Sequence, residues 1–296
     1  MIRISRQIFL SLVSCLAFAQ LAMAAPVVLP PPVVPYAVQY DNFFSYSAKL
    51  LTGFGLPGFD VNTGTGGLDV LIYTGANGAN NTGVGAGGLF NFPDPLAAPG
   101  GGDTSVAGVW GPTNIPVGTG PIPVSYMLDY LHATFGAQAN VPIFDFDMNQ
   151  TGASPDLQVV GQVRVRNASN TVIASWAFDN ITDNKFEDTA WVTAPGTITA
   201  TNPLPPFQSV TVDNNKGSGK LDFIVYAPTM NLALFNAAGN TIEFDFRMQG
   251  LNDGFEELFL TGGFAPAAVP EPGTMLLMGI GAAGAAFMRR RAKKAH

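Results

Sequence analysis

Hydrophobic and polar positions alternate along much of the chain between residues 140 and 262. In segment 242–248, four apolar residues alternate with two acids and an arginine, and segment 157–165 repeats the alternation. A period of two with one polar face predicts strands that are half-buried in an antiparallel sheet. The apolar positions of the two segments are Ile242, Phe244, Phe246 and Met248, and Leu157, Val159, Val163 and Val165.

Shorter apolar runs predict further strands, and turn residues separate them. A single helix is predicted over residues 125–134, with Ser125 as N-cap and with Met127, Leu128, Leu131 and Phe135 on one face. Together these elements predict an all-β protein: an antiparallel, jelly-roll-like β-sandwich with long Gly/Pro-rich loops and one short helix. The further strands are predicted at residues 67–73, 104–110, 143–148, 172–178, 210–213, 221–226 and 258–260.

The N-terminus has the layout of a secretory signal peptide. The segment 1–7 has a net positive charge, and the segment 8–18 is apolar. Ala22 and Ala24 supply the small residues that a signal peptidase needs. We therefore expect residues 1–24 to form a signal helix that the Sec translocon recognises and signal peptidase removes. The alternative is a lipobox at residues 12–15, in which Cys15 would be lipidated.

The C-terminus combines a short motif, an apolar helix and a basic end. Pro270, Glu271 and Pro272 precede an apolar run over residues 274–288, and Arg289, Arg290 and Arg291 follow it. A helix of about sixteen residues spans roughly 24 Å, which is slightly short of a hydrocarbon core of about 30 Å but adequate for a transmembrane helix whose basic end residues snorkel. The basic cluster should stay cytoplasmic, so the preceding domain faces outward from the inner membrane.

This C-terminal order of features resembles the PEP-CTERM sorting signal, which is also catalogued as an ice-binding-protein C-terminal motif. The resemblance covers about 25 residues at the end of the chain. It implies that an exosortase in the inner membrane recognises the chain, cuts near the Pro-Glu-Pro motif and releases the protein or transfers it onward. The implied setting is the cell surface or extracellular matrix of a Gram-negative bacterium that produces exopolysaccharide. The ice-binding label carries no expectation of activity, because the sequence holds no regular threonine array.

These features divide the chain into four segments. Residues 1–24 are the signal peptide, 25–35 a Pro-rich extended leader, 36–265 one β-sandwich ectodomain, and 266–296 the sorting signal.

The formal net charge of −7 hides an uneven distribution of charge, because residues 26–270 hold seven basic and twenty acidic side chains, a difference of −13. So acidic a domain is not expected to bind nucleic acid. The single cysteine excludes an intramolecular disulfide.

No familiar catalytic arrangement stands out, and we do not expect an enzyme. The sequence lacks G-x-S-x-G, H-E-x-x-H and a Walker A lysine, and the glycine-rich segment 83–88 lacks the strand-to-helix context of a phosphate loop. Only His132 remains as a histidine of the processed domain, and its place on the predicted helix favours a structural role.

Two acidic segments supply the candidate metal ligands. Residues 145–156 place oxygen-bearing side chains in the order of a calcium loop, and the acidic turn at residues 252–257 could complete the site. Gln150 and Pro155 depart from that pattern, and the alternative is an ordinary strand end followed by a turn. The candidate Ca²⁺ ligands are Asp145, Asp147, Asn149, Asp156, Asp253 and Glu256.

These observations favour an exported, exosortase-processed surface or matrix protein with a structural or adhesive role in exopolysaccharide, biofilm or floc. The alternative is a secreted carbohydrate-binding module, which would need exposed aromatic rings; Trp110, Trp176 and Trp191 are the candidates, with Trp176 more suited to the core. A glycan-degrading enzyme is a third hypothesis, and it requires two close carboxylates across a cleft.

Overall fold

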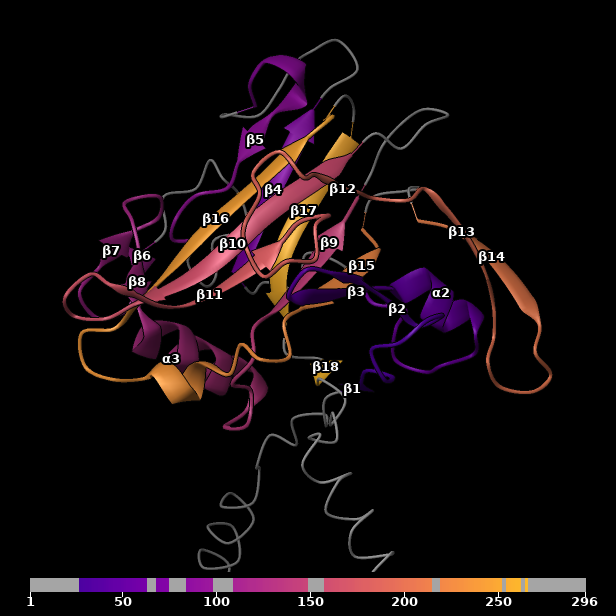
Figure 1. Cartoon of the computed structure of the whole chain (residues 1–296), viewed down its shortest axis with the longest axis horizontal. Helices are drawn as coiled ribbons and strands as arrows, with labels where there is room; N and C mark the ends of the chain where they lie inside the picture. Colours follow the sequence, from indigo (N-terminus) through magenta and orange to yellow (C-terminus); the bar gives the residue numbers. More distant parts are fainter. Residues whose placement is uncertain are drawn as a thin grey trace, which may run out of the picture.

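The computed structural model is mostly β, with antiparallel main sheets and two α-helices among the residues it describes (Figure 1). Those residues are 27–62, 68–74, 84–97, 109–148, 157–214, 219–251, 254–261 and 264–265. The predicted signal helix and the predicted transmembrane helix both lie outside these ranges. Within them, no helix is both long and apolar enough to cross a membrane.

The first six-stranded sheet is built around the two long strands β10 (Gln158–Arg166) and β16 (Thr241–Gln249), which pair along their full length. In β16 buried and half-buried residues alternate strictly, which confirms the predicted period of two. Four shorter strands complete the sheet: β5 (Phe90–Asn91), β8 (Ile122–Pro123), β11 (Val172–Phe178) and β12 (Val192–Thr193).

The second six-stranded sheet has the order β2-β3-β15-β9-β17-β4. Its central strands are far more buried than the outer strand β2, and every residue of β9 and β15 is buried. The strand bounds are β2 (Ala37–Tyr40), β3 (Phe43–Ser47), β15 (Phe223–Tyr226), β9 (Ile143–Asp147), β17 (Gly254–Thr261) and β4 (Leu68–Thr74).

One hydrophobic core joins the two sheets. The ring of Phe144 on β9 contacts Phe244 and Phe246 on β16, with ring centroids 6.2 and 5.1 Å apart. Gly161 on β10 lies opposite Phe246, and its missing side chain leaves the space that the phenylalanine ring occupies. The inward residues of both sheets therefore pack against each other, as apolar faces of sheets must.

Helix α3 (Val124–Phe135) closes one end of this core. It buries Met127, Leu128 and Leu131, as the predicted apolar face requires. The Tyr130 hydroxyl accepts a hydrogen bond from the Leu68 amide of β4 at 2.8 Å and lies 3.3 Å from the Leu260 carbonyl of β17. The predicted N-cap is wrong: the helix begins at Val124, directly after Pro123, and Pro123 is the N-cap residue.

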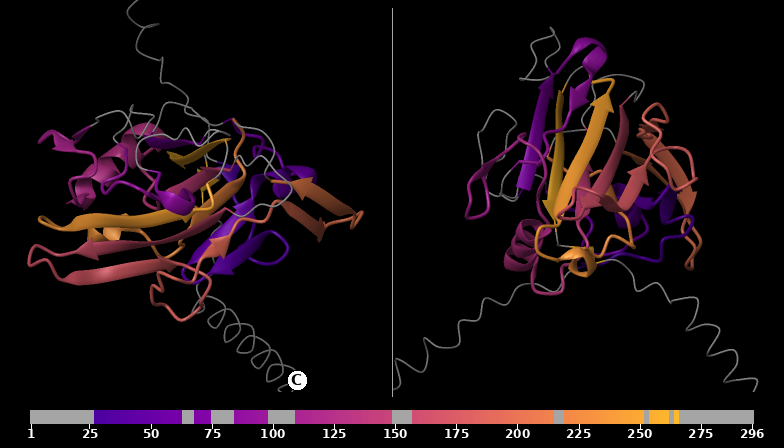
Figure 2. Two further views of the ribbon diagram at one scale, coloured as in Figure 1. Left: turned by 90° about the horizontal axis from the view of Figure 1, so that it is seen from above. Right: turned by 60° about the vertical axis from the view of Figure 1, so that its left-hand side comes forward.

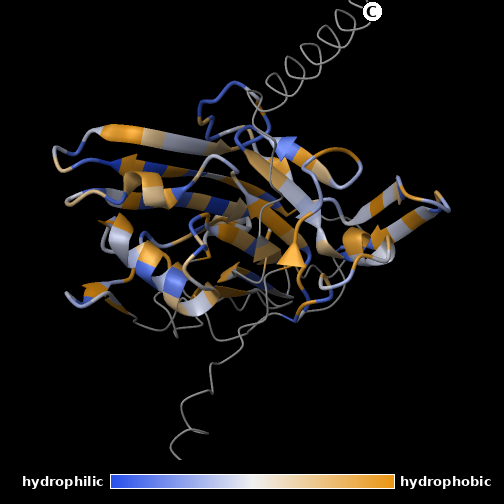
Figure 3. Cartoon of the chain, turned by 90° about the horizontal axis from the view of Figure 1, so that it is seen from below, coloured by the Kyte–Doolittle hydropathy of each residue, from blue (hydrophilic) through white to orange (hydrophobic). Residues whose placement is uncertain are grey.

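A two-stranded hairpin, β13 (Thr197–Thr201) and β14 (Ser209–Asp213), projects from the opposite side of the domain (Figures 1 and 2). Hydrophobic and hydrophilic residues alternate along it (Figure 3). It packs on helix α2 (Ala48–Gly53), where a Cβ atom at Gly53 would lie 2.6 Å from Cγ1 of Val210. Glycine at this position lets the helix approach the hairpin closely.

The first and last described strands pair with each other. Strand β1 (Val27–Val28) runs parallel to β18 (Phe264–Ala265), and they lie side by side in Figure 1. Leu29 is buried, and the Tyr46 hydroxyl donates a hydrogen bond to the Pro30 carbonyl at 2.9 Å. Leu29 and Pro30 of the Pro-rich leader are therefore packed on the domain, whereas Val28, Val33 and Val34 are exposed. Four small elements complete the described fold: the paired strands β6 (Val109–Trp110) and β7 (Ile115–Pro116), and the 3₁₀ turns η1 (Ala86–Gly88) and η2 (Leu232–Phe235).

Candidate functional site

Two of the predicted calcium ligands lie on the outer face of the second sheet. In β9, Phe144 and Phe146 point into the shared core, whereas Asp145 and Asp147 share the opposite face with Ile143. Both aspartates are nonetheless buried. The Gly219 amide donates a hydrogen bond to Asp147 Oδ2 at 2.7 Å, so part of this carboxylate is held by backbone.

Glu256 lies on the other face of the same sheet. It alternates with Glu257 along β17, shares its face with the core residue Leu258 and stands opposite Ile72 of β4. The acid that stands beside Asp147 across the strands is Glu257. The predicted grouping of Glu256 with Asp145 and Asp147 around one ion is therefore not the one that the strand register produces.

The remaining predicted ligands, Asn149, Asp156 and Asp253, lie outside the described residues, as do the sorting residues near both termini. Within the described ranges, no group of three or more His, Cys, Asp or Glu side chains could hold a metal ion. Calcium binding therefore stays a prediction that depends on ligands outside the described residues, and the strand register places Glu257, not Glu256, on the face of Asp145 and Asp147.

A fourth acid, Asp222, extends this face directly before β15. Its Oδ1 lies 2.7 Å from Lys49 Nζ, and its Oδ2 accepts a hydrogen bond from the Met148 amide at 2.8 Å. Burial raises the pKa of Asp222 to about 7; the negative charge of Asp147 adds to the rise, whereas Lys49 and the Met148 amide oppose it. Desolvation of the carboxylate thus outweighs its ion pair.

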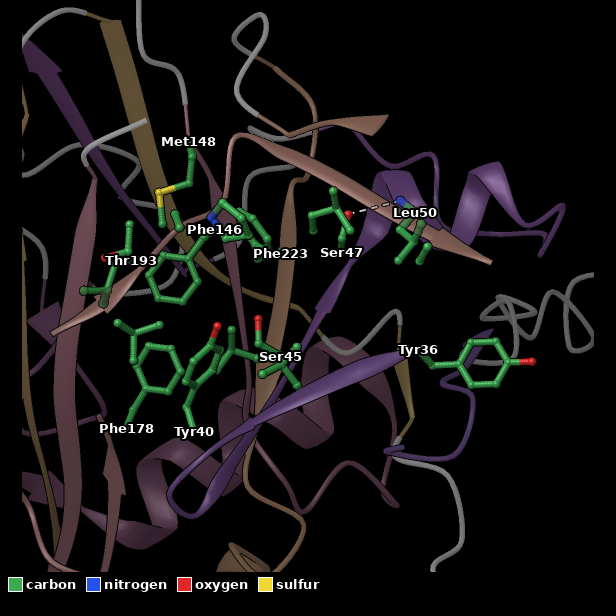
Figure 4. A pocket seen from close by; sticks show the side chains of 18 of the residues that line it. Tyr36, Tyr40, Ser45, Ser47, Leu50, Phe146, Met148, Phe178, Thr193 and Phe223 are labelled. Carbon is green, nitrogen blue, oxygen red and sulfur yellow. Dashed lines mark hydrogen bonds between the residues drawn. The ribbon is translucent and has the colours of Figure 1, made fainter. Parts of the chain in front are cut away.

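An apolar pocket lies between the two sheets beside the projecting hairpin (Figure 4). It has a volume of about 180 Å³. One wall comes from the second sheet, the facing wall from the first sheet, and the hairpin and the end of the leader complete the rim. The lining residues are Val34, Pro35, Tyr36, Val38, Tyr40, Ser45, Ser47, Leu50, Phe146, Met148, Val159, Phe178, Val192, Thr193, Ala194, Pro195, Ile198, Ala200, Phe223 and Val225.

Small side chains on β3, the strand next to the outer strand β2, explain this space. The inward positions of β3 after Phe43 are Ser45 and Ser47, whereas the neighbouring strands place Phe223 and Phe146 at the same level. Ala194 and Ala200 are the corresponding small residues on the other side of the pocket. Serine and alanine are too short to meet across the gap between the sheets, so the volume stays open.

The polar groups of the pocket fall into two classes. Ser47 is already engaged, because its Oγ accepts a hydrogen bond from the Leu50 amide and donates one to Asn214 Oδ1. Thr193 accepts a hydrogen bond from Gln158 Nε2 at 3.0 Å. The hydroxyls of Tyr40 and Ser45, by contrast, make no side-chain hydrogen bond to any residue that the structure describes. Burial raises the pKa of the Tyr40 phenol.

The tryptophans do not form an exposed aromatic platform. Trp110 is buried and donates a hydrogen bond from Nε1 to the Leu96 carbonyl at 2.7 Å. Trp176 is buried as well, as expected, with its Nε1 bonded to Thr229 Oγ1 at 3.0 Å. Trp191 is half-buried. His132 lies on α3 and pairs with Asn140 Oδ1 at 2.9 Å, which agrees with a structural role.

The fold and the pocket together define a mostly β domain with an apolar pocket between two antiparallel sheets. Residues 27–211, more than half of the chain, match the family described as a domain of unknown function (DUF8239), and the chain belongs to this family. Residues 268–291 match the PEP-CTERM protein-sorting motif. Comparison with curated proteins and with solved structures finds no match. The motif confirms the predicted sorting signal and indicates an exported protein, anchored in the membrane before an exosortase processes it.

Proposed function

We propose that this protein is a structural or adhesive component of the cell surface or extracellular matrix of a Gram-negative bacterium, in an exopolysaccharide, biofilm or floc setting. The observation that carries the proposal is the PEP-CTERM motif at residues 268–291, which follows an acidic β-rich domain. We also infer that the two main sheets form one jelly-roll-like sandwich. The shared core between Phe144 and the phenylalanines of β16 supports this.

The charge distribution supports an extracellular role. Between residues 26 and 270 the excess of thirteen acidic over basic side chains keeps the domain soluble through self-repulsion and away from anionic membranes. The basic residues concentrate at the two ends, which processing would remove. Of the three candidate tryptophans, Trp110 and Trp176 are buried and Trp191 is half-buried, so Trp110 and Trp176 give the carbohydrate-binding alternative no support.

The sorting step is tested with the whole chain in a Gram-negative host, with and without a matching exosortase. We expect the exosortase to shorten the chain and to move it from the inner membrane to the surface or medium. Glu271→Ala should block both changes, whereas the control Asp60→Ala, at a largely exposed position, should not. An unchanged size and unchanged membrane retention in every case would reduce the motif to a simple anchor.

The adhesive role is tested separately in the native cell. A strain that lacks the protein should aggregate less, and the wild-type chain should restore aggregation while Glu271→Ala should not. The protein should also fractionate with the exopolysaccharide. Normal aggregation without the protein, together with its absence from the polysaccharide fraction, would contradict the structural or adhesive role even if sorting proceeds as expected.

A further inference from the structure

We propose that the pocket between the sheets binds a small neutral molecule, or the neutral end of a larger one, with one apolar ring or short alkyl chain and one hydroxyl group. This goes beyond the surface role proposed above and does not depend on it. Three features of the pocket carry the inference: its volume, the absence of charge from its lining, and two hydroxyls that no described residue engages.

The volume sets the size of the apolar group. Protein interiors are normally close-packed, so about 180 Å³ between two well-packed sheets is a space that the chain itself leaves open. A dry cavity of roughly 150 Å³ lined by aliphatic and aromatic side chains is known to bind benzene. The pocket therefore suits one aromatic ring or a short alkyl chain rather than a long acyl chain or a polysaccharide segment.

The lining sets the charge of the ligand. None of the pocket's lining side chains is ionised at neutral pH, and most of them are aliphatic or aromatic. A carboxylate or ammonium group would lose its hydration there without gaining a counter-charge, which is costly. A neutral ligand escapes this penalty, and its apolar surface gains free energy in proportion to the area buried.

The polar atoms set the position of the hydroxyl. Tyr40 and Ser45 lie on the neighbouring strands β2 and β3, and their hydroxyls are turned toward Phe146 and Phe223 in the view of Figure 4. Tyr40 is itself held by edge-on contact with Phe178, with ring centroids 5.7 Å apart. A ligand hydroxyl between these two side chains could both donate and accept a hydrogen bond.

The opening lies where the lining is exposed. Val34 and Val38 belong to the pocket rim and are 81% and 52% exposed, whereas Phe146 and Phe223 deep in the pocket are buried. A small ligand can therefore enter between the leader and the hairpin, with its apolar group toward Phe146. A larger molecule would keep its remainder outside, above the two valines.

Benzyl alcohol is the probe that matches this description, and benzoate and benzylamine are its charged analogues. Binding is measured by saturation-transfer NMR on the full chain in lipid nanodiscs, with empty nanodiscs as the lipid control. We expect saturable binding of benzyl alcohol and at least tenfold weaker binding of both charged compounds. Equal binding of all three, or no binding of benzyl alcohol to the folded chain, would overturn the proposal.

The site is located with a matched pair of substitutions on β13. Ala200 lines the pocket, whereas its neighbour Thr199 is exposed on the other face of the strand. Ala200→Phe should fill the space and weaken benzyl alcohol binding at least tenfold, and Thr199→Phe should leave it unchanged. Undiminished binding to Ala200→Phe, with its fold verified by circular dichroism, would place the binding elsewhere and contradict the proposal.

Ser45→Ala provides a test that does not fill the pocket. Loss of one hydrogen bond of ordinary strength should weaken benzyl alcohol binding roughly fivefold and leave toluene binding unaltered. Equal affinity of wild type and Ser45→Ala for benzyl alcohol would contradict the assigned position of the ligand hydroxyl.

Discussion

The ring of Phe246 on β16 occupies the place that a side chain on Gly161 of β10 would need. Any larger residue at position 161 must displace this ring, which also packs on Phe144 of the second sheet. Gly161 thus lets the Phe246 ring lie where it contacts the second sheet.

Gly161→Ala is therefore expected to lower the free energy of unfolding by about 1–3 kcal/mol, the usual cost of overpacking a core. Urea unfolding measured by circular dichroism checks this. Gly85→Ala is the control, because a Cβ atom there would meet only the Leu89 carbonyl oxygen, at the ordinary distance of 3.5 Å. An equal loss of stability in both variants would contradict the role of the Gly161–Phe246 contact.

Asp222 is expected to make stability depend on pH between about 4 and 7. Its pKa is raised to about 7 in the folded chain from 3.8, so in this range the folded state binds more protons than the unfolded state. The contribution of Asp222 to stability therefore falls as the pH rises, by at most about 1.4 kcal/mol per pH unit, and levels off above about pH 7.

Asp222→Asn should remove this part of the pH dependence of the unfolding free energy. Asp60→Asn, which changes a carboxylate in an exposed pair with Lys220, should leave it in place. Thermal unfolding across the pH range distinguishes the two variants. A pH profile that Asp222→Asn does not flatten would show that another group produces the slope.

The sequence predicts calcium binding, and the strand register changes which glutamate is expected to take part. Titration of the full chain with Ca²⁺ is expected to give heat and a rise in melting temperature, both lost in Asp145→Asn/Asp147→Asn. Because Glu257 shares their face and Glu256 does not, Glu257→Gln should weaken binding more than Glu256→Gln. No heat and no thermal shift in the wild-type chain would end the calcium hypothesis.

The strands that could be predicted from the sequence are those in which apolar and polar residues alternate regularly. Strand β16 extends only one residue to each side of the predicted segment 242–248, and β11 coincides with the predicted segment 172–178. The hairpin strand β13 and strands β2 and β3 were not predicted. Segment 43–47 shows why: Phe-Phe-Ser-Tyr-Ser has no period of two in hydropathy, and its pairing with β2 and β15 makes it a strand.

The pocket was beyond sequence reasoning for a similar reason. Its open volume depends on small residues such as Ser45 and Ala200 lining the same space, although more than 150 residues separate them in the chain. Small residues in a strand give no sign of what faces them. The acids on β9 and β17 were visible in the sequence, but which of Glu256 and Glu257 joins Asp147 depends on the register of one strand.

The pairing of β1 with β18 has a mechanical consequence. Phe264 of β18 stacks on Phe59 and runs beside Val27, and the sorting segment follows it directly along the chain. Tension applied through the sorting segment reaches the β1–β18 pair before it reaches β17 and the main sheets. A domain held at its C-terminus therefore bears load first on the contact between its two ends, which spares the pocket and the shared core.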